Sequence, residues 1–367
     1  MAYKKVRLGD YLLGYDEINE NGEFSNIDDL QGINSDKYFQ GCKSNKNEID
    51  LNRYRICRQG MFAYNKATSR NGEKISIAYR TGKDCIISPS YICFSVKDES
   101  VLIPEYLMIW FMRPIFDRYA RYNSWGSATE FFTWEDFQEI DFELPSIEIQ
   151  KTIVRQFKTI KERIAVLERE NSELYKVLEN EFALVKKKCD TTEELGEICF
   201  YVKEKKNFSD IASQEYVSTE NMLANKGGIE SFGFLEDDSR VTYYQPNDIL
   251  VSNIRPYFKK IYLCQREGGC NSDVLCFRAV DSNKQFLLFS ALYEDDFYEY
   301  VMTTVKGTKM PRGDKDDILK YSIPSLNEKE LKNFNKFAGI IHKMIAQHNY
   351  EMKLLREILL NIASNLR

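Results

Sequence analysis

The sequence predicts an α+β fold: two tandem mixed α/β units, separated and followed by long helices that form an antiparallel coiled coil with pseudo-two-fold symmetry. Three observations predict this fold. Two stretches carry apolar residues at alternating spacings of three and four, which is the pattern of a heptad seam. Both stretches begin with an apolar-Pro-Ser triplet, and both follow a globular stretch whose motifs come in the same order. We therefore expect a duplicated chain divided into residues 1–145, 146–188, 189–324 and 325–367.

The first long helix is expected over residues 146–188. Its apolar seam is Ile153, Phe157, Ile160, Ile164, Leu167, Leu174, Leu178 and Val185, with Asn171 and Glu181 at two polar seam positions. The second is expected over 325–367, with the seam Leu331, Phe334, Ala338, Ile341, Ile345, His348, Met352, Leu355, Leu359, Ile362 and Leu366. A seam of this length predicts a rod that joins other elements.

The two helix starts predict how the rods are capped and aligned. Proline ends the preceding segment, and Ser146 or Ser325 can cap the helix that follows. Ser325 with Glu328 forms the spacing of a capping box. If the rods pair antiparallel with full overlap, Asn171 faces residue 342, and a contact with His348 requires a shift of about six residues. Each polar seam residue either fixes the register or faces solvent.

Composition limits the class of protein. Apolar residues make up 43% of 367, no run of 18 apolar residues occurs, and the first residues do not resemble a signal peptide, so we expect a cytoplasmic protein with no membrane partner. Nine cysteines without a CxxC pair and two histidines argue against a disulfide framework or a metal site. The net charge of −5 is unevenly distributed: residues 43–83 hold ten basic side chains against three acidic ones.

Both globular stretches contain short β-type runs, and each closes with an amphipathic helix and a glycine-containing loop. The runs are expected at Ile75–Tyr79, Cys85–Val96, Asp248–Ile254, Lys260–Cys264 and Asp273–Val280, and the helices at Pro104–Tyr119 and Gln285–Val305. Matching motifs recur 179 to 188 residues apart, with Asn65 matched to Asn253 and Gly126 to Gly307. Motifs that keep their order while the distance between matching motifs varies are typical of duplicated units whose loops have diverged.

Two motifs resemble a known family. The runs Asp248–Ile261 (DILVSNIRPYFKKI) and Gly268–Leu275 (GGCNSDVL), together with the helix start Leu144–Gln150 (LPSIEIQ), are similar to the specificity (S) subunit of Type I restriction–modification systems. The resemblance implies two target recognition domains that each read one half of a bipartite, asymmetric site in double-stranded DNA, with the coiled coil setting the spacing. It also implies a chain without catalysis or cofactor of its own. The implied partners are DNA methyltransferase (modification) subunits using S-adenosylmethionine and a restriction/translocase subunit using ATP and Mg.

Basic and polar residues beside the predicted strands are the candidate DNA contacts, because Arg, Lys and Asn read base edges and phosphates. In the first unit they are Asn65, Lys66, Ser69, Arg70, Lys74, Gly126 and Ser127; in the second they are Asn253, Arg255, Tyr257, Lys259, Lys260, Lys306, Thr308, Lys309 and Arg312. The competing structural interpretation makes these segments solvated turns and a linker. Trp125, beside Gly126, is expected either at the site or in the core.

Two other functions remain open from the residues. The chain lacks GxGxxG and GxxxxGK[ST], but Glu204-Lys205-Lys206 with Asp190 upstream has the spacing of a nuclease motif. In a chain with 29% charged residues such triplets arise by chance. A scaffold whose duplicated units bind proteins instead of DNA is the second alternative.

Overall fold

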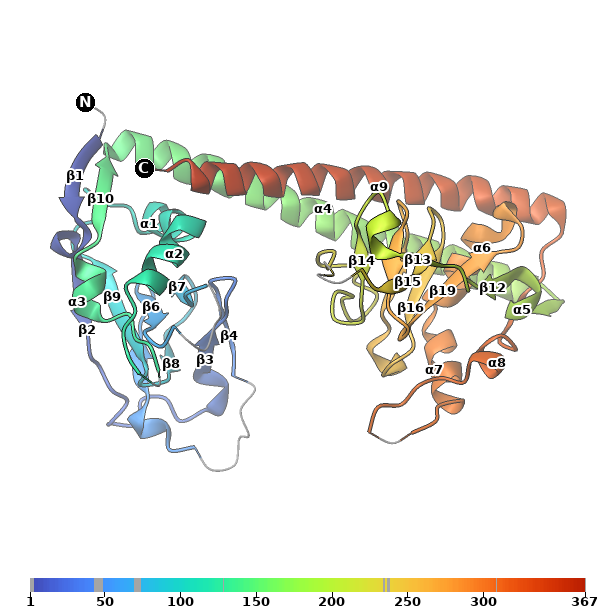
Figure 1. Cartoon of the computed structure of the whole chain (residues 1–367), viewed down its shortest axis with the longest axis horizontal. Helices are drawn as coiled ribbons and strands as arrows, with labels where there is room; N and C mark the ends of the chain where they lie inside the picture. Colours follow the sequence, from blue (N-terminus) through green and yellow to red (C-terminus); the bar gives the residue numbers. More distant parts are fainter. Residues whose placement is uncertain are drawn as a thin grey trace. The chain divides into compact units, whose positions relative to one another are not determined.

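The computed structural model describes residues 3–42, 49–68, 74–127, 129–233, 235, 238–307 and 309–366. The chain forms two compact units. Unit 1 comprises Met1–Ala165 and Met352–Arg367, and unit 2 comprises Val166–Glu351. Both are mixed α/β and both include parts of two long helices, as the predicted fold class requires (Figure 1).

Unit 1 contains two four-stranded sheets and a two-stranded ribbon. The first sheet has the order β2 (Leu12–Tyr15), β9 (Tyr91–Val96), β6 (Phe62–Asn65), β7 (Ile77–Tyr79). The second has the order β4 (Phe39–Gly41), β3 (Leu30–Ile33), β8 (Cys85–Ile87), β5 (Arg55–Cys57). The ribbon pairs β1 (Tyr3–Arg7) antiparallel with β10 (Asp141–Pro145), the strand that precedes the first long helix.

Unit 2 repeats this plan, except that the outer strand of its second sheet lies on the opposite edge. Its first sheet has the order β12 (Cys199–Tyr201), β19 (Val274–Ala279), β16 (Ile249–Ser252), β17 (Ile261–Leu263). Its second has the order β13 (Lys205–Asn207), β15 (Arg240–Tyr244), β18 (Gly268–Cys270), β14 (Tyr216–Val217). The ribbon pairs β11 (Thr192–Glu194) with β20 (Ser322–Pro324).

Strand pairing shows which residues of the two units are equivalent. β3 lies parallel to β8 and β14 parallel to β18, while every other pair is antiparallel. In the first sheets Asn65 pairs with Tyr91 and Ser252 with Val274, so Asn65 is equivalent to Ser252. The predicted match of Asn65 with Asn253 is therefore wrong by one residue, and Asn253 corresponds to Lys66.

Each expected amphipathic helix is broken into two. Unit 1 has α1 (Pro104–Phe111) and α2 (Pro114–Tyr122), followed by α3 (Trp134–Gln138). Pro114 has no N–H to continue α1, and it begins α2 instead. Unit 2 has α5 (Leu195–Ile198), α6 (Gln285–Tyr293), α7 (Asp295–Thr303) and α8 (Lys315–Ile318), with Glu294 in an extended conformation between α6 and α7.

The long helices are α4 (Ile147–Lys188) and α9 (Glu328–Ser364). Gln150 in the first turn of α4 is fully buried: its amide donates to the Val101 and Pro145 carbonyls at 2.9 Å and accepts from the Ile103 N–H at 2.8 Å. The capping box of α9 is formed by Asn327 and Glu330. The predicted box at Ser325 and Glu328 is thus wrong by two residues.

The period-two pattern of the sheets sorts their residues between two cores. In unit 1, Phe62, Tyr64 and Phe94 pack against α1–α3, whereas Ala63, Ala78 and Cys93 on the same strands pack against the second sheet. Unit 2 repeats the division, with Ile249, Val251 and Phe277 facing helices and Leu250 and Cys276 facing the second sheet.

Both long helices complete both helical cores. In unit 1, Phe157 of α4 and Leu359, Ile362, Ala363 and Leu366 of the C-terminal stretch join the core. In unit 2, the contributing residues are Leu178 and Phe182 of α4 and Phe334, Ala338, Ile341 and Ile345 of α9. Phe182 is buried in the place expected for Glu181, so the α4 seam departs from strict alternation at its end.

A polar cluster aligns α4 and α9 within unit 2. The Asn171 amide oxygen accepts from His348 Nδ1 at 2.8 Å, and its nitrogen donates to Asn349 Oδ1 at 3.0 Å. The helices are therefore shifted by about six residues from the full-overlap register. Residue 342, the partner expected for Asn171 in that register, is a histidine that stacks on Phe286 with ring centroids 5.0 Å apart. None of the helices in the described ranges combines the length and apolar composition needed to cross a membrane.

His342 makes unit 2 sensitive to acid. Burial lowers the pKa of its imidazole from 6.5 to about 4. Between these values the unfolded chain binds a proton that the folded chain does not, so stability is lost as the pH falls from 6.5 towards 4. We expect His342→Phe to remove roughly 2 to 3 kcal/mol of this loss. Urea unfolding of both proteins at pH 7.5 and pH 4.5 measures the loss of stability. An equal effect of the substitution at both pH values would contradict the prediction.

Candidate nucleic-acid interface

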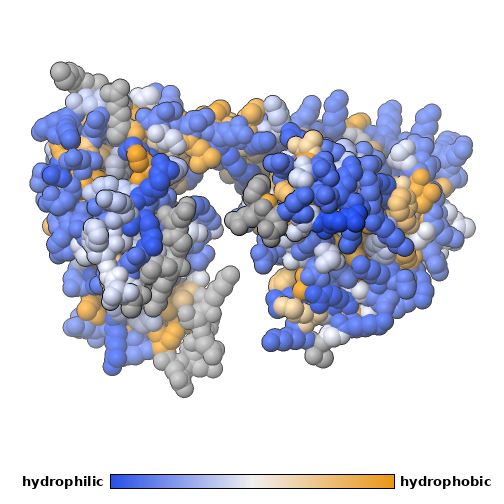
Figure 2. Space-filling model, in the orientation of Figure 1, coloured by the Kyte–Doolittle hydropathy of each residue, from blue (hydrophilic) through white to orange (hydrophobic). Residues whose placement is uncertain are grey.

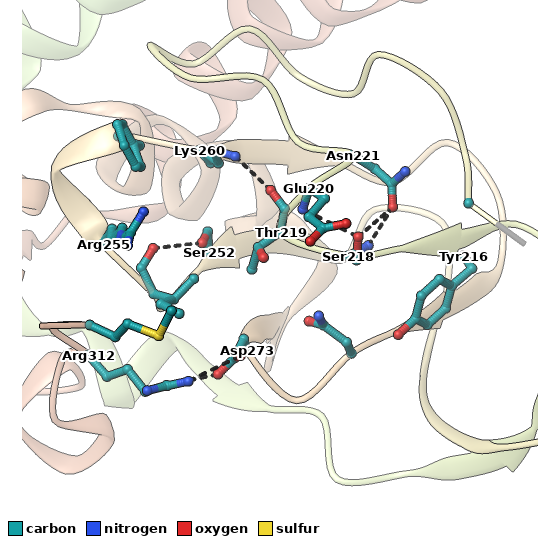
Figure 3. Close-up of a pocket in the computed structure, with 15 residues that line it drawn as sticks. Tyr216, Ser218, Thr219, Glu220, Asn221, Ser252, Arg255, Lys260, Asp273 and Arg312 are labelled. Atoms are coloured by element: carbon teal, nitrogen blue, oxygen red, sulfur yellow. Dashed lines mark hydrogen bonds and ion pairs between the residues drawn. The ribbon is translucent and has the colours of Figure 1, made fainter. Parts of the chain in front are cut away.

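A polar groove of about 730 Å³ opens in unit 2 at the ends of strands β16 and β17 (Figure 3). Three segments form its walls: the turn after β16, the hairpin 306–312 and the segment 216–221 after β14. The groove is lined by Tyr216, Ser218, Thr219, Glu220, Asn221, Gly233, Ser252, Ile254, Arg255, Phe258, Lys260, Asn271, Asp273, Met310 and Arg312.

The turn after β16 presents Arg255 to the groove. The Arg255 N–H donates to the Pro311 carbonyl at 2.9 Å, which ties the turn to the hairpin. Arg255 and Lys259 have φ of 51° and 50°, on either side of the single 3₁₀ turn Pro256–Phe258. Through its side chain Arg255 makes no hydrogen bond or ion pair with any residue in the described ranges, so its guanidinium is available to a ligand.

An aromatic pair stands beside Arg255. Tyr257 is 47% exposed and Phe258 38% exposed, with ring centroids 4.7 Å apart. Lys260 lies over the Phe258 ring at 5.8 Å and donates to the Thr219 carbonyl at 2.6 Å. Burial lowers the pKa of Lys260, and the charge of Glu220 opposes this effect. Arginine, lysine and exposed aromatic rings in one groove are the chemistry that binds nucleic acid.

Two cations of the hairpin 306–312 are paired with aspartates. Arg312 donates to both Asp273 carboxylate oxygens, at 2.9 and 3.2 Å, and this interaction raises the pKa of Arg312. Lys306 pairs with Asp314, which raises the pKa of Lys306 and lowers that of Asp314. Gly307 has φ of 90°, a conformation that favours glycine. Lys309 is exposed at the tip, and Thr308 lies outside the described residues.

Two predicted contacts in unit 2 have internal roles. Asn253 is only 6% exposed, and its amide donates to the Gly313 carbonyl at 3.2 Å. It therefore supports the hairpin from below, and its prediction as a DNA contact needs correction. Lys259 pairs with Asp295 at 3.0 Å and does not line the groove.

The segment 216–221 was not predicted as part of the site. Asn221 Oδ1 accepts from the Ser218 N–H at 3.0 Å and from the Ser218 hydroxyl at 2.7 Å, which closes a tight turn (Figure 3). The polar run Ser218-Thr219-Glu220-Asn221 is the signal that could have found it. Asn271, whose buried side-chain oxygen lacks a partner in the described part of the chain, was also missed.

In unit 1 the equivalent positions carry different side chains. Bridges pair Ala67 and Trp125 with Phe131, as they pair Ile254 and Lys306 with Arg312. Trp125 therefore replaces Lys306, and Phe131 replaces Arg312. Trp125 is 65% exposed and so does not belong to the core. Lys66 lies over the Phe131 ring at 5.8 Å.

The remaining candidates in unit 1 lie near this hairpin or carry partners. Gly126 has φ of 148°, and a Cβ there would meet the Thr129 carbonyl oxygen at 2.1 Å; Ser127 follows it in the exposed turn. Asn65 Oδ1 accepts from the Ala67 N–H at 3.1 Å. Lys74 pairs with Asp36 at 3.7 Å. Ser69 and Arg70 lie outside the described residues.

Side chains of metal-ligating types and the possible nuclease triplet were also located in the structure. In the described ranges, no group of three or more His, Cys, Asp or Glu side chains is arranged to hold a metal ion. Lys206 of the Glu204-Lys205-Lys206 triplet lies 3.4 Å from the centre of the Tyr243 ring. Its ammonium group is thus engaged in a structural contact.

Comparison with known proteins identifies the fold. The Type I restriction modification DNA specificity domain family matches residues 15–176. The S subunit of a Type I restriction–modification system from M. genitalium is 13% identical, with a TM-score of 0.51 over 99% of this chain and 96% of that chain.

Two further structures are similar. One, described as the structural basis of complex assembly and conformational transition of the Type I R-M system, is 16% identical over 100% of this chain and 97% of that chain, with a TM-score of 0.46. The HsdS subunit from Thermoanaerobacter tengcongensis is 16% identical over 100% and 96%, with a TM-score of 0.40. No curated protein sequence matches this chain significantly. Residues 15–176 thus match the Type I restriction modification DNA specificity domain family, and the whole chain has the fold of a Type I restriction–modification specificity subunit.

Proposed function

We propose that this chain is the DNA sequence-recognition subunit of a Type I restriction–modification complex, and that each unit reads one half of a bipartite, asymmetric site in double-stranded DNA. One observation carries the proposal: the two units share the topology of the first sheet and of three strands of the second, but present different side chains at equivalent positions of the same hairpin. A shared scaffold gives both units the same way of approaching DNA, and the exchanged side chains give them different base preferences.

Unit 2 has the chemistry to read guanine. Arginine donates two hydrogen bonds to the O6 and N7 atoms of guanine in the major groove, and Arg255 is the groove arginine whose side chain has no partner in the described ranges. Arg312 is held in place by Asp273, which limits its freedom and suits it to a fixed phosphate or base contact.

Unit 1 presents an aromatic surface at the equivalent hairpin. Trp125 and Phe131 offer apolar faces to a thymine methyl group or an unstacked base step, and Lys66 supplies a cation for a phosphate. The two half-sites therefore differ in sequence, which makes the complete site asymmetric.

The long helices are assigned two roles: they set the spacing of the half-sites, and they dock the methylating subunits. Exposed apolar residues recur along both helices, at Val177 and Leu184 of α4 and at Ile340, Met344, Tyr350, Leu354, Ile358 and Leu360 of α9. Figure 2 shows such hydrophobic residues, in orange, among the hydrophilic surface of these helices. Exposed apolar residues in this number favour a protein partner.

Catalysis would then belong to the partners in a cytoplasmic complex. The methylating subunits would use S-adenosylmethionine, and a restriction/translocase subunit would use ATP and Mg. A scaffold that binds only proteins is the competing function, and it predicts no salt-dependent binding to DNA.

One arginine substitution and one lysine substitution test DNA recognition. Arg255→Ala should relax the preference at one or two base pairs and cost about 1 to 3 kcal/mol of specific binding. Lys309→Ala, at the exposed hairpin tip, should weaken binding to all sequences and reduce the salt slope by about one. Both are measured as duplex affinity at several salt concentrations, with the methylating subunits present. If both variants bind like the wild type at every salt concentration, the groove is not the DNA interface.

Matched insertions in the helices test the spacer. Seven residues added after Ala165 and seven after Leu354 keep both heptad seams and keep Asn171 beside His348. The pair lengthens by about 10 Å, so the preferred gap between half-sites should grow by roughly three base pairs. Since three added base pairs also rotate one half-site relative to the other about the duplex axis, the affinity for the duplex should fall. Selection from random duplexes measures the gap; an unchanged gap at unchanged affinity would show that the helices are not the spacer.

A further inference from the structure

Two loops of unit 2 are locked together beside the groove. The Asn225 N–H donates to the Phe258 carbonyl at 2.8 Å, and the Lys226 N–H donates to the Lys259 carbonyl at 2.7 Å. Asn225, Lys226, Arg255 and Lys259 all have left-handed backbones, with φ of 54°, 62°, 51° and 50°. Left-handed backbones are uncommon for residues other than glycine and gather where a functional segment is held in one conformation.

One aspartate holds both loops. Asp295, the first residue of α7, accepts from Lys226 at 2.8 Å and from Lys259 at 3.0 Å. Lys226 also reaches Glu179 of α4 at 2.7 Å, and it lies 4.8 Å from the centre of the Tyr293 ring. The hydrogen bond from Lys226 is the main reason that the pKa of Asp295 is lowered. The turn that carries Arg255 is thus fixed to α7 directly and to α4 through Lys226.

Unit 1 has the same arrangement built from other positions. Lys37, in the turn after β3, has φ of 66°, and its ammonium lies 2.8 Å from Asp117 of α2. Lys37 also lies over the Phe116 ring at 5.4 Å. Asp117 accepts a second hydrogen bond from the Ile75 N–H at 3.1 Å, at the end of the segment that joins β6 to β7.

The two arrangements share four features. A lysine with a left-handed backbone follows the strand that pairs parallel, β3 or β14, and this lysine lies over an aromatic ring. The lysine pairs with an aspartate near the start of α2 or α7. The same aspartate also binds the β6–β7 or β16–β17 connection. Asp117 lies in the fourth position of α2, whereas Asp295 lies in the first of α7. Equivalent pairs at displaced positions indicate that the tie itself serves a purpose.

Stability alone accounts poorly for the unit 2 tie. The Lys226 side chain is 13% exposed, but its two acceptors face solvent, Asp295 at 55% and Glu179 at 35%, and ion pairs with solvent-exposed carboxylates contribute little to folding. What the tie does fix is the position of the β16–β17 turn, from which Arg255 reaches into the groove.

We propose that Asp295 is a positioning residue for sequence recognition, and that it holds the turn that carries Arg255 through Lys226 and Lys259, two lysines with left-handed backbones. This inference rests on the proposed function, and it adds a residue that does not touch the DNA. Discrimination in the half-site read by unit 2 then depends on this aspartate–lysine tie. Without the tie, the turn keeps its charged side chains and its phosphate contacts, but its base-reading side chain is no longer held in one position.

The test uses the full chain with its methylating subunits and selection from random duplexes. Asp295→Ala should lower the discrimination in one half-site about tenfold and leave the other unchanged, because a misdirected base contact costs as much as a mismatch. Asp295→Glu should restore part of it. Glu173→Gln removes an exposed α4 ion pair with Lys176 and serves as the control.

The unaffected half-site is an internal measure of folding. If Asp295→Ala selects both half-sites with wild-type discrimination, or relaxes both together, the positioning role is overturned. Affinity for random duplex should change by less than about threefold, since the phosphate contacts remain; a uniform loss of affinity with discrimination intact also contradicts the inference. A wild-type complex that selects no sequence removes the proposed function and the positioning role with it.

Discussion

The antiparallel pairing of α4 and α9 is the constraint on which the rest of each unit depends. Neither helical core is complete without residues from both helices: Phe157 and Ile362 contribute to unit 1, and Phe182 and Ile341 to unit 2. The helices are far apart in sequence, so each unit closes only when the chain has returned along α9. Asn171, His348 and Asn349 set the register of this pairing in unit 2, because a shifted register would bury their polar groups without partners.

On this scaffold the two units keep the same first sheet and three strands of the second sheet, and they change the side chains. The inner face of the second sheet illustrates how far the change extends: Cys57 and Cys85 pair across β5 and β8, whereas the same positions in unit 2 are Tyr244 and Gly268. A Cβ on Gly268 would meet the Tyr244 hydroxyl at 2.2 Å, so the small residue makes room for the large one. The hairpins vary in the same manner, because unit 1 has Trp125 and Phe131 where unit 2 has Lys306 and Arg312. In the hairpins, however, the exchange alters the surface that we assign to DNA.

Local sequence patterns predicted the architecture. The helix register and the partners of the site residues depend on contacts between residues far apart in the sequence, which local patterns do not reveal. Heptad spacing and the Pro-Ser starts predicted two long helices, and the order of motifs predicted the duplication. The register was left open between full overlap and a shift of about six residues, because no local pattern decides between them; the Asn171–His348 contact shows the shift. Asn253 was predicted as a DNA contact because asparagine can read a base edge, but its contact with the Gly313 carbonyl is a long-range one that no local pattern reveals. The partners Asp273, Asp295 and Asp117 lie 30 to 80 residues from the cations or turns that they hold, beyond any local motif.

The account is tested most directly by the sequence that the wild-type complex selects. The full chain, purified with its methylating subunits, is offered duplexes with a long random segment, and the bound sequences are aligned. Our account predicts two short, different sequences separated by a gap of constant length and variable composition. A single continuous sequence, two identical half-sites, or no enrichment at any salt concentration would contradict it.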